Sequence, residues 1–134
     1  MEKIVLDTNI LIEILKNNPL VVSVFNQTSS KFAISSISAM ELYYGARDKK
    51  ELQKLKKFIT FFDTIELDTT TSTTATLLIE MYAKSHSLTI PDALIAATSM
   101  KHSYPLWTLN VKDFHYIDGL NLFAPECIET LKVK

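Results

Sequence analysis

Short apolar runs alternate with helical patterns along the whole chain, and this alternation constrains the fold more than any other feature. Apolar residues between the runs recur at the spacing of amphipathic helices. Strands and helices in alternation predict parallel strands with helices on both faces, which is a three-layer α/β/α sandwich around a central sheet of four to five strands. The predicted strands, which are short and rich in branched or aromatic residues, are Lys3–Leu6, Phe32–Ile34, Thr64–Leu67, Leu106–Leu109 and Leu120–Phe123.

The predicted helices have recognisable starts and ends. Pro19 and Pro91 suit the first turn of a helix, where the backbone N–H group that proline lacks would have no partner. Gly45 suits a helix end. The polar stretch Thr69–Thr74 is predicted to be an exposed loop that caps the helix after it. The helical patterns cover residues 10–15, 19–25, 40–44, 52–62, 76–84 and 91–103.

Length and charge limit the classes of protein that remain. The 134 residues, 47% of them hydrophobic, suit one domain over residues 1–134 with its own core. A net charge of −1 excludes a protein that grips nucleic acid through bulk positive charge, although a local basic patch remains open. No apolar run approaches the ~20 residues that cross a bilayer, so we expect a cytoplasmic protein without a targeting or membrane segment.

The single cysteine, Cys127, excludes a disulfide framework and fits a reducing compartment. We expect it to act as a small apolar residue or to lie on the surface.

Acidic residues gather where a parallel sheet binds its ligands, beyond the carboxyl ends of the strands. Asp7 directly follows the first predicted strand, and Asp113 comes shortly after the strand at Leu106–Leu109. Two further acids, Glu41 and Asp92, stand near the starts of predicted helices.

Each acid also has a purely structural explanation. Asp7 suits the N-cap of the first helix, and Asp113 suits a solvated loop. Ser38 and Glu41 fit a capping box, in which the Glu41 carboxylate would bond back to the backbone of Ser38. Asp92 suits the positive end of its helix, an interaction worth about 0.3–1 kcal/mol. These four explanations are independent of one another, so they leave the grouping of the acids unexplained.

A cation site explains the four acids together. Carboxylates at one sheet edge repel one another, and their pKa values rise unless a cation neutralises them. Carboxylate oxygens suit Mg²⁺ or Mn²⁺. Such an ion lowers the pKa of a bound water and stabilises charge on a phosphoryl group. The sequence therefore points to metal-assisted phosphoryl chemistry.

Four blocks of sequence carry the acids and their polar neighbours. They are VLDTN at 5–9, SAMELYYG at 38–45, IPDALIAAT at 90–98 and TLNVKDF at 108–114. Together and in this order, the blocks resemble the motifs of the PIN-domain ribonucleases, and within that family the VapC-type toxins of bacterial and archaeal toxin–antitoxin pairs. The resemblance covers nearly the whole chain.

The resemblance implies a PIN-like sandwich with an acidic pocket that holds Mg²⁺, or Mn²⁺ in its place, and activates a water to cleave RNA phosphodiester bonds. The acids that would be catalytic and metal-binding are Asp7, Glu41, Asp92 and Asp113. The residues that would orient these carboxylates or the water are Asn9, Thr108 and Asn110. Many relatives have Arg where this chain has Leu109, so phosphate contact there would depend on another group, such as Lys112.

The same resemblance implies a toxin that inhibits translation by cutting tRNA or another structured RNA. It also implies a cognate VapB-like antitoxin as a partner, and a homodimer. The stretch Arg47–Lys57 holds six basic residues against Asp48 and Glu51, with all its lysines in Lys49–Lys57. This stretch is either a solvated helix face or a patch that contacts RNA phosphates.

Aromatic residues are dense around this stretch, and they belong either to the core or to an exposed groove for a partner. They are Tyr43, Tyr44, Phe58, Phe61 and Phe62.

Three other classes stay open at this stage. A non-catalytic PIN-like module would bind RNA or protein without needing the acids. Phosphotransfer domains also place an Asp after their first strand, but the phosphatase pattern needs a second Asp where this chain has Asn9, and a receiver needs a further acidic pair. A DNA-structure nuclease of the same fold usually carries additional domains.

Overall fold

The computed structural model describes residues 2–125, and its centre is a four-stranded parallel sheet with the strand order β3-β2-β1-β4. The predicted parallel α/β architecture is therefore confirmed, with four strands. Leu120–Phe123 forms no strand: it contributes one isolated bridge, between Leu122 and Leu106, in which the Leu106 N–H donates to the Asn121 carbonyl and the Phe123 N–H donates to the Leu106 carbonyl. The strands are β1 (Lys3–Leu6), β2 (Lys31–Ser35), β3 (Asp63–Ile65) and β4 (Leu106–Trp107).

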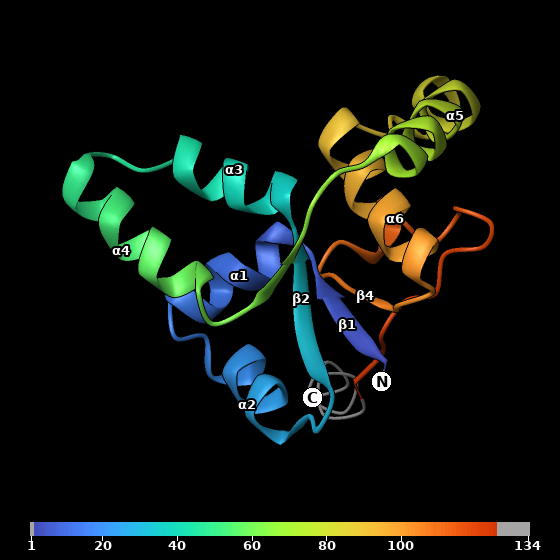
Figure 1. Cartoon of the computed structure of the whole chain (residues 1–134). Coiled ribbons are helices and arrows are strands. Elements are labelled where there is room, and N and C mark those ends of the chain that lie inside the picture. The colour runs from blue at the N-terminus through green and yellow to red at the C-terminus, as the bar shows by residue number, and fades with distance from the viewer. Residues whose placement is uncertain (1, 126–134) are drawn as a thin grey trace.

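Helices cover both faces of the sheet (Figure 1). Helices α1 to α4 pack on one face, and α5 and α6 pack on the other, so the chain has three layers. The helices are α1 (Thr8–Leu15), α2 (Pro19–Gln27), α3 (Ser36–Tyr44), α4 (Lys49–Ile59), α5 (Thr69–His86) and α6 (Ile90–His102), followed by a short 3₁₀ helix, η1 (Val111–Asp113).

The alternation of side chains along β1 divides the core into two clusters. Ile4 and Leu6 are buried among α1 to α4, whereas Val5 is buried on the opposite face against α5 and α6. Strand β4 repeats the pattern, with Trp107 on the first face and Leu106 on the second. A sheet buried on both faces needs such continuous apolar strands.

The polar stretch Thr69–Thr74 is helical, so the prediction of a loop there is wrong. Helix α5 begins at Thr69 because the Asp68 carboxylate caps it, accepting from the Thr71 N–H at 2.8 Å. Threonine hydroxyls inside the helix donate back to carbonyls one turn earlier, as Thr73 does to Thr69 at 3.0 Å. The Thr73 hydroxyl is therefore satisfied within the helix, whereas the buried Thr71 hydroxyl has no hydrogen-bond partner among residues 2–125.

The aromatic residues near α4 divide between core and surface. Phe62 is buried, and Phe58 packs edge-on against it with ring centroids 5.2 Å apart. Tyr43 packs against the same core cluster. Tyr44 and Phe61 are exposed.

No helix in residues 2–125 is long and apolar enough to span a bilayer. Cys127, for which we expected an apolar or surface position, lies outside the described residues.

Candidate active site

The site lies where the strand order reverses. Chain order runs from β1 to β2 and β3 on one side, whereas β4 pairs with the other side of β1. The crevice beyond the carboxyl ends of β1 and β4 is therefore the topological switch point, where open α/β sheets bind their ligands. Leu6 pairs with Trp107 across these strands, and the residues that follow each of them, Asp7 and Thr108, meet at the crevice.

Asp7 is held by two hydrogen bonds and is nearly removed from water. Its Oδ1 accepts from the Thr8 N–H at 2.8 Å, and its Oδ2 accepts from the Thr108 hydroxyl at 2.7 Å. The residue is 5% exposed. Burial raises the pKa of the Asp7 carboxyl despite both bonds, and the charges of Glu41 and Asp113 raise it further. Asp7 is also the N-cap of α1, as its structural explanation predicts, so the same residue starts this helix and belongs to the acidic edge.

Thr8 connects Asp7's helix to Glu41. Thr8 Oγ1 lies 2.7 Å from Glu41 Oε1 and 2.9 Å from Ser38 Oγ. An ionised carboxylate only accepts, so the Thr8 hydroxyl donates to Glu41, and the Ser38 hydroxyl is left to donate to Thr8. The predicted capping box between Ser38 and Glu41 is therefore wrong. Helix α3 begins earlier, at Ser36, with Ser35 as its N-cap, which frees the Glu41 carboxylate for the site.

Asp92 lies in the first turn of α6, where Thr89 is the N-cap. Burial, followed by the charge of Asp7, raises the pKa of Asp92 to about 6, and the charges of Asp113 and Glu41 contribute further. A helix N-terminus favours a carboxylate by about 0.3–1 kcal/mol. Burial and the neighbouring acids are the causes that raise the pKa of this carboxyl, which stands at a helix N-terminus.

Asp113 ends the short 3₁₀ helix η1 and is exposed. Its charge raises the pKa of both Asp7 and Asp92, so it lies within electrostatic reach of the two partly buried acids. The structure therefore brings the four predicted acids to one sheet edge, from four separate elements of the chain.

The polar residues predicted to support the acids lie around Thr108. Asn9 Nδ2 donates to Thr108 Oγ1 at 3.4 Å, and Asn9 Oδ1 accepts from the Leu109 N–H at 3.3 Å. Asn110 takes part through its backbone N–H, which donates to Thr108 Oγ1 at 3.0 Å. Thr108 is thus fixed from two sides while it donates to Asp7.

The donor set of this edge fits a hard divalent cation, because it consists of carboxylate and hydroxyl oxygens and its acids repel one another. Within residues 2–125, no group of three or more His, Cys, Asp and Glu side chains is close enough to form a finished metal site. The acids therefore share an edge without forming a closed coordination shell. Asp7, Asp92, Glu41 and Asp113 are the residues that would hold an ion there.

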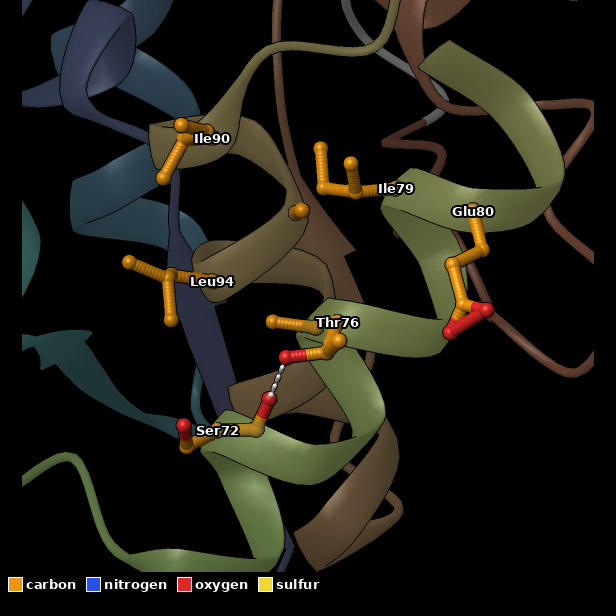
Figure 2. Close-up of a pocket in the computed structure, with 8 residues that line it drawn as sticks. Ser72, Thr76, Ile79, Glu80, Ile90 and Leu94 are labelled. Atoms are coloured by element: carbon orange, nitrogen blue, oxygen red, sulfur yellow. Dashed lines mark hydrogen bonds between the residues drawn. The ribbon is translucent and has the colours of Figure 1, made fainter.

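A separate apolar pocket of about 430 Å³ lies between α5 and α6 (Figure 2). Ile90, Ala93 and Leu94 line it from α6, whereas Asp92 lies on another face of that helix. On α5, the Thr76 hydroxyl donates a hydrogen bond to the Ser72 carbonyl at 2.9 Å (Figure 2). This pocket therefore has no side chain of the acidic edge in its lining.

Stability of the metal-free protein is expected to fall as pH rises through the interval between the unfolded and folded pKa values of Asp92, from 3.8 to about 6. A raised carboxyl pKa means that the folded chain binds the proton more tightly than the unfolded chain, so stability is lost as pH passes the folded value. For Asp92 the window runs from 3.8 to about 6, and we expect about 1 kcal/mol after screening of this half-buried group. Thermal unfolding in chelator, compared with Asp92→Asn, checks this; equal pH dependence in both proteins would contradict it.

Comparison with known proteins agrees with this geometry. The PIN domain family matches residues 4–120. The tRNA(fMet)-specific endonuclease VapC of Shigella flexneri is 31% identical over 126 residues, covering 90% of this chain and 96% of that protein. Ribonuclease VapC1 of Methanocaldococcus jannaschii is 30% identical, covering 90% of this chain and 85% of that one. The chain therefore belongs to the PIN domain family, and it is similar to VapC endonucleases over nearly its full length.

Solved structures give the same result. The DNA-bound VapBC structure from Salmonella typhimurium matches with a TM-score of 0.80 at 29% identity, covering 92% of this chain and 98% of that one. A toxin–antitoxin complex from Klebsiella pneumoniae matches with a TM-score of 0.75, also at 29% identity, covering 90% and 96%.

Two residues of the site were not identified from the sequence. Thr8 and Ser38 connect α1 to the Glu41 carboxylate, although both lie inside blocks that we quoted for their acids. Ser38 lies one turn before Glu41 on α3, and Thr8 follows Asp7. That spacing was the available signal, but a capping box explained it equally well.

Proposed function

We propose that this protein is a divalent-metal-dependent endoribonuclease that acts as the toxin of a VapBC-type pair. In this proposal Asp7, Glu41, Asp92 and Asp113 are its catalytic and metal-binding residues, and Mg²⁺ or Mn²⁺ is its cofactor. The observation that carries the proposal is the meeting of Asp7 with Thr108 at the switch point, within electrostatic reach of the other three acids. The names of its full-length relatives, which are endonucleases and ribonucleases, support it.

The chain's own residues prepare the site for phosphodiester hydrolysis. Thr108 and the Thr8 N–H fix the two oxygens of Asp7, and Thr8 fixes Glu41 beside it. Asp92 is fixed on the first turn of a buried helix rather than on a loop. A cation bound by these carboxylates would lower the pKa of a water and stabilise charge on the phosphoryl group.

The substrate that we propose is tRNA or another structured RNA, because a relative aligned over nearly the whole chain is named for tRNA(fMet). Cleavage of such RNA would inhibit translation in the cell. Two similar solved structures are a toxin–antitoxin complex and a DNA-bound VapBC complex, which supports a VapB-like antitoxin as partner. We also expect a homodimer, and sedimentation of the purified protein tests this.

Cleavage of total RNA and tRNA by the purified protein tests the proposal, with Mg²⁺, with Mn²⁺ and with chelator. Metal-dependent cutting that the Asp7→Asn protein lacks would support it. Folded protein that binds RNA but cuts none under any of these conditions would instead favour the non-catalytic binding module.

Thr108→Val is expected to slow RNA cleavage by about 10- to 100-fold, the usual effect of losing a group that orients a metal ligand. Valine keeps the volume of threonine but removes the hydroxyl that donates to Asp7 and accepts from the Asn110 N–H. Thr108→Ser keeps that hydroxyl and is the matched control. Initial cleavage rates of the two proteins check this, and equal rates for valine and serine would show that the hydroxyl does not matter.

One internal ion pair neutralises part of the positive charge of the basic stretch Arg47–Lys57. Arg47 is paired with Glu51 at 2.8 Å, whereas Lys54, Lys56 and Lys57 are exposed on α4. Replacing these three lysines with Ala is expected to weaken RNA binding and to lower the salt slope of log K by up to about 2, since each phosphate contact with single-stranded RNA contributes roughly 0.7. Filter binding at several salt concentrations measures the slope. An unchanged slope would assign the lysines to a solvated helix face.

A further inference from the structure

We propose that Tyr44 is a base-stacking residue, which holds an unpaired nucleobase of the RNA beside the acidic edge. This inference rests on the proposed ribonuclease function and adds to it a specific contact with the substrate. Tyr44 is the last residue of α3, and it is 95% exposed. An aromatic ring so fully in water contributes little to the core, so its position needs another explanation.

Tyr44 shares a surface pocket with one of the four acids. The pocket, of about 330 Å³, is lined by Met40, Glu41 and Tyr44. Met40 and Tyr44 are four residues apart on α3 and therefore lie on the same side of the helix. Met40 is 53% exposed, and its flexible thioether and the tyrosine ring give this pocket two apolar walls beside a carboxylate. Through Glu41 and Thr8, the pocket adjoins the residues that hold Asp7.

An unpaired base fits these walls better than a protein partner does. The pocket is lined from a single helix by three residues, which suits one flat ring and not the several turns of a partner helix. The chain beyond Tyr44 turns basic, since Lys49 and Lys50 open α4 and are exposed. An aromatic platform followed by basic side chains is the arrangement by which proteins bind single-stranded nucleic acid. Bases splayed from loops and ends are also what proteins read in structured RNA.

The stacking contact would lie next to the acids that are proposed to cleave the RNA. Glu41 belongs to both the acidic edge and the pocket, so a base held against Tyr44 places the neighbouring phosphodiester toward the acids. Base stacking on an aromatic side chain changes affinity by about 5- to 100-fold on alanine substitution. The contact is sequence-tolerant because every base has a flat face. Tyr44 would therefore set where an unpaired nucleotide sits rather than which base it carries.

Fluorescence of single-stranded 12-nucleotide RNAs, each with one 2-aminopurine, tests the proposal in an Asp92→Asn background, in which the expected slow cleavage leaves the RNA intact during the measurement. The chain with Tyr44 intact should quench the probe, because stacking quenches 2-aminopurine. Adding Tyr44→Ala should abolish the quenching and weaken binding by about 5- to 100-fold, whereas Tyr44→Phe should change affinity by less than about 2-fold because the ring remains.

Phe61→Ala is the matched control. Phe61 is also an exposed aromatic residue, at 75%, but it precedes β3 and therefore lies toward the opposite, amino end of the sheet. Its removal should leave quenching and affinity unchanged. Equal behaviour of Tyr44→Ala and Phe61→Ala would overturn the proposal, as would equal losses in Tyr44→Ala and Tyr44→Phe, which would implicate the hydroxyl. RNA cleavage by the unsubstituted protein is measured in parallel, and its absence would overturn the ribonuclease function itself.

Discussion

The Asp92→Asn protein is expected to cleave RNA about 10²- to 10⁴-fold more slowly than the unsubstituted protein, and to unfold at the same or a higher temperature. Asparagine matches the shape of aspartate but carries no charge to hold a cation or to act on a proton. Groups with such roles contribute rate factors of this size. In the absence of a metal this charge lowers the stability of the folded chain, because burial and the neighbouring Asp7 have raised the pKa of Asp92 to about 6. Rate and stability therefore change in opposite directions.

Asp63→Asn is the control for this substitution. It makes the same chemical change at an exposed residue that begins β3, at the opposite end of the sheet, where Asp63 pairs with Lys3 at 3.0 Å. We expect its cleavage rate to equal that of the unsubstituted protein and its stability to change little, because solvent screens this exposed ion pair. Initial rates on tRNA and thermal unfolding in chelator measure both quantities. A rate for Asp92→Asn close to that of Asp63→Asn would remove Asp92 from the active site.

Trp107→Ala is expected to lower the free energy of unfolding by about 3–5 kcal/mol, the usual cost of removing a buried tryptophan. Trp107 is 1% exposed and is among the largest fully buried side chains. Its ring lies 6.1 Å from that of Phe32 and 5.7 Å from that of Phe123. Domains of this size are stable by only about 5–15 kcal/mol, so this substitution removes a large part of the total.

Trp107 also connects the core to the acidic edge. The Trp107 carbonyl accepts from the Asp7 N–H at 2.9 Å, and the next residue is Thr108. Trp107→Phe keeps an aromatic ring and is expected to lose less stability than Trp107→Ala. Urea unfolding of the three proteins gives the free energies. A loss below about 1 kcal/mol for Trp107→Ala would mean that the core cluster around Trp107 is packed less tightly than the structure describes.

The sequence was most informative where apolar strands precede polar residues. Strand β1 matches its prediction, because the run Lys3–Leu6 is apolar and Asp7 ends it. The two proline-started helices, α2 and α6, also begin near their predicted positions, since proline fits the first turn. The parallel sheet followed from this alternation, and it alone was enough to bring Asp7 and Thr108 to one edge.

The sequence was least informative where one polar residue had two available partners. Ser38 and Glu41 have the spacing of a capping box, and only the position of α1 against α3 shows that Thr8 is the partner of Glu41. Thr69–Thr74 has the composition of a loop, but Asp68 caps it as a helix. The first outcome depends on a contact between residues 33 positions apart, which local spacing cannot show. The second depends on a cap directly before the polar stretch, which the composition of the stretch itself does not include.

The most direct test of whether the acidic edge is a metal site is to measure Mn²⁺ binding. Binding is detected as a decrease in the electron paramagnetic resonance signal of free Mn²⁺. We expect the unsubstituted protein to bind Mn²⁺ saturably, Mg²⁺ to compete, and the Asp7→Asn/Asp92→Asn protein to bind far more weakly. The Mn²⁺ concentration that gives half-saturation should match the one that gives half-maximal RNA cleavage. Equal Mn²⁺ binding by both proteins, or full cleavage in chelator, would contradict a metal-dependent nuclease built on these acids.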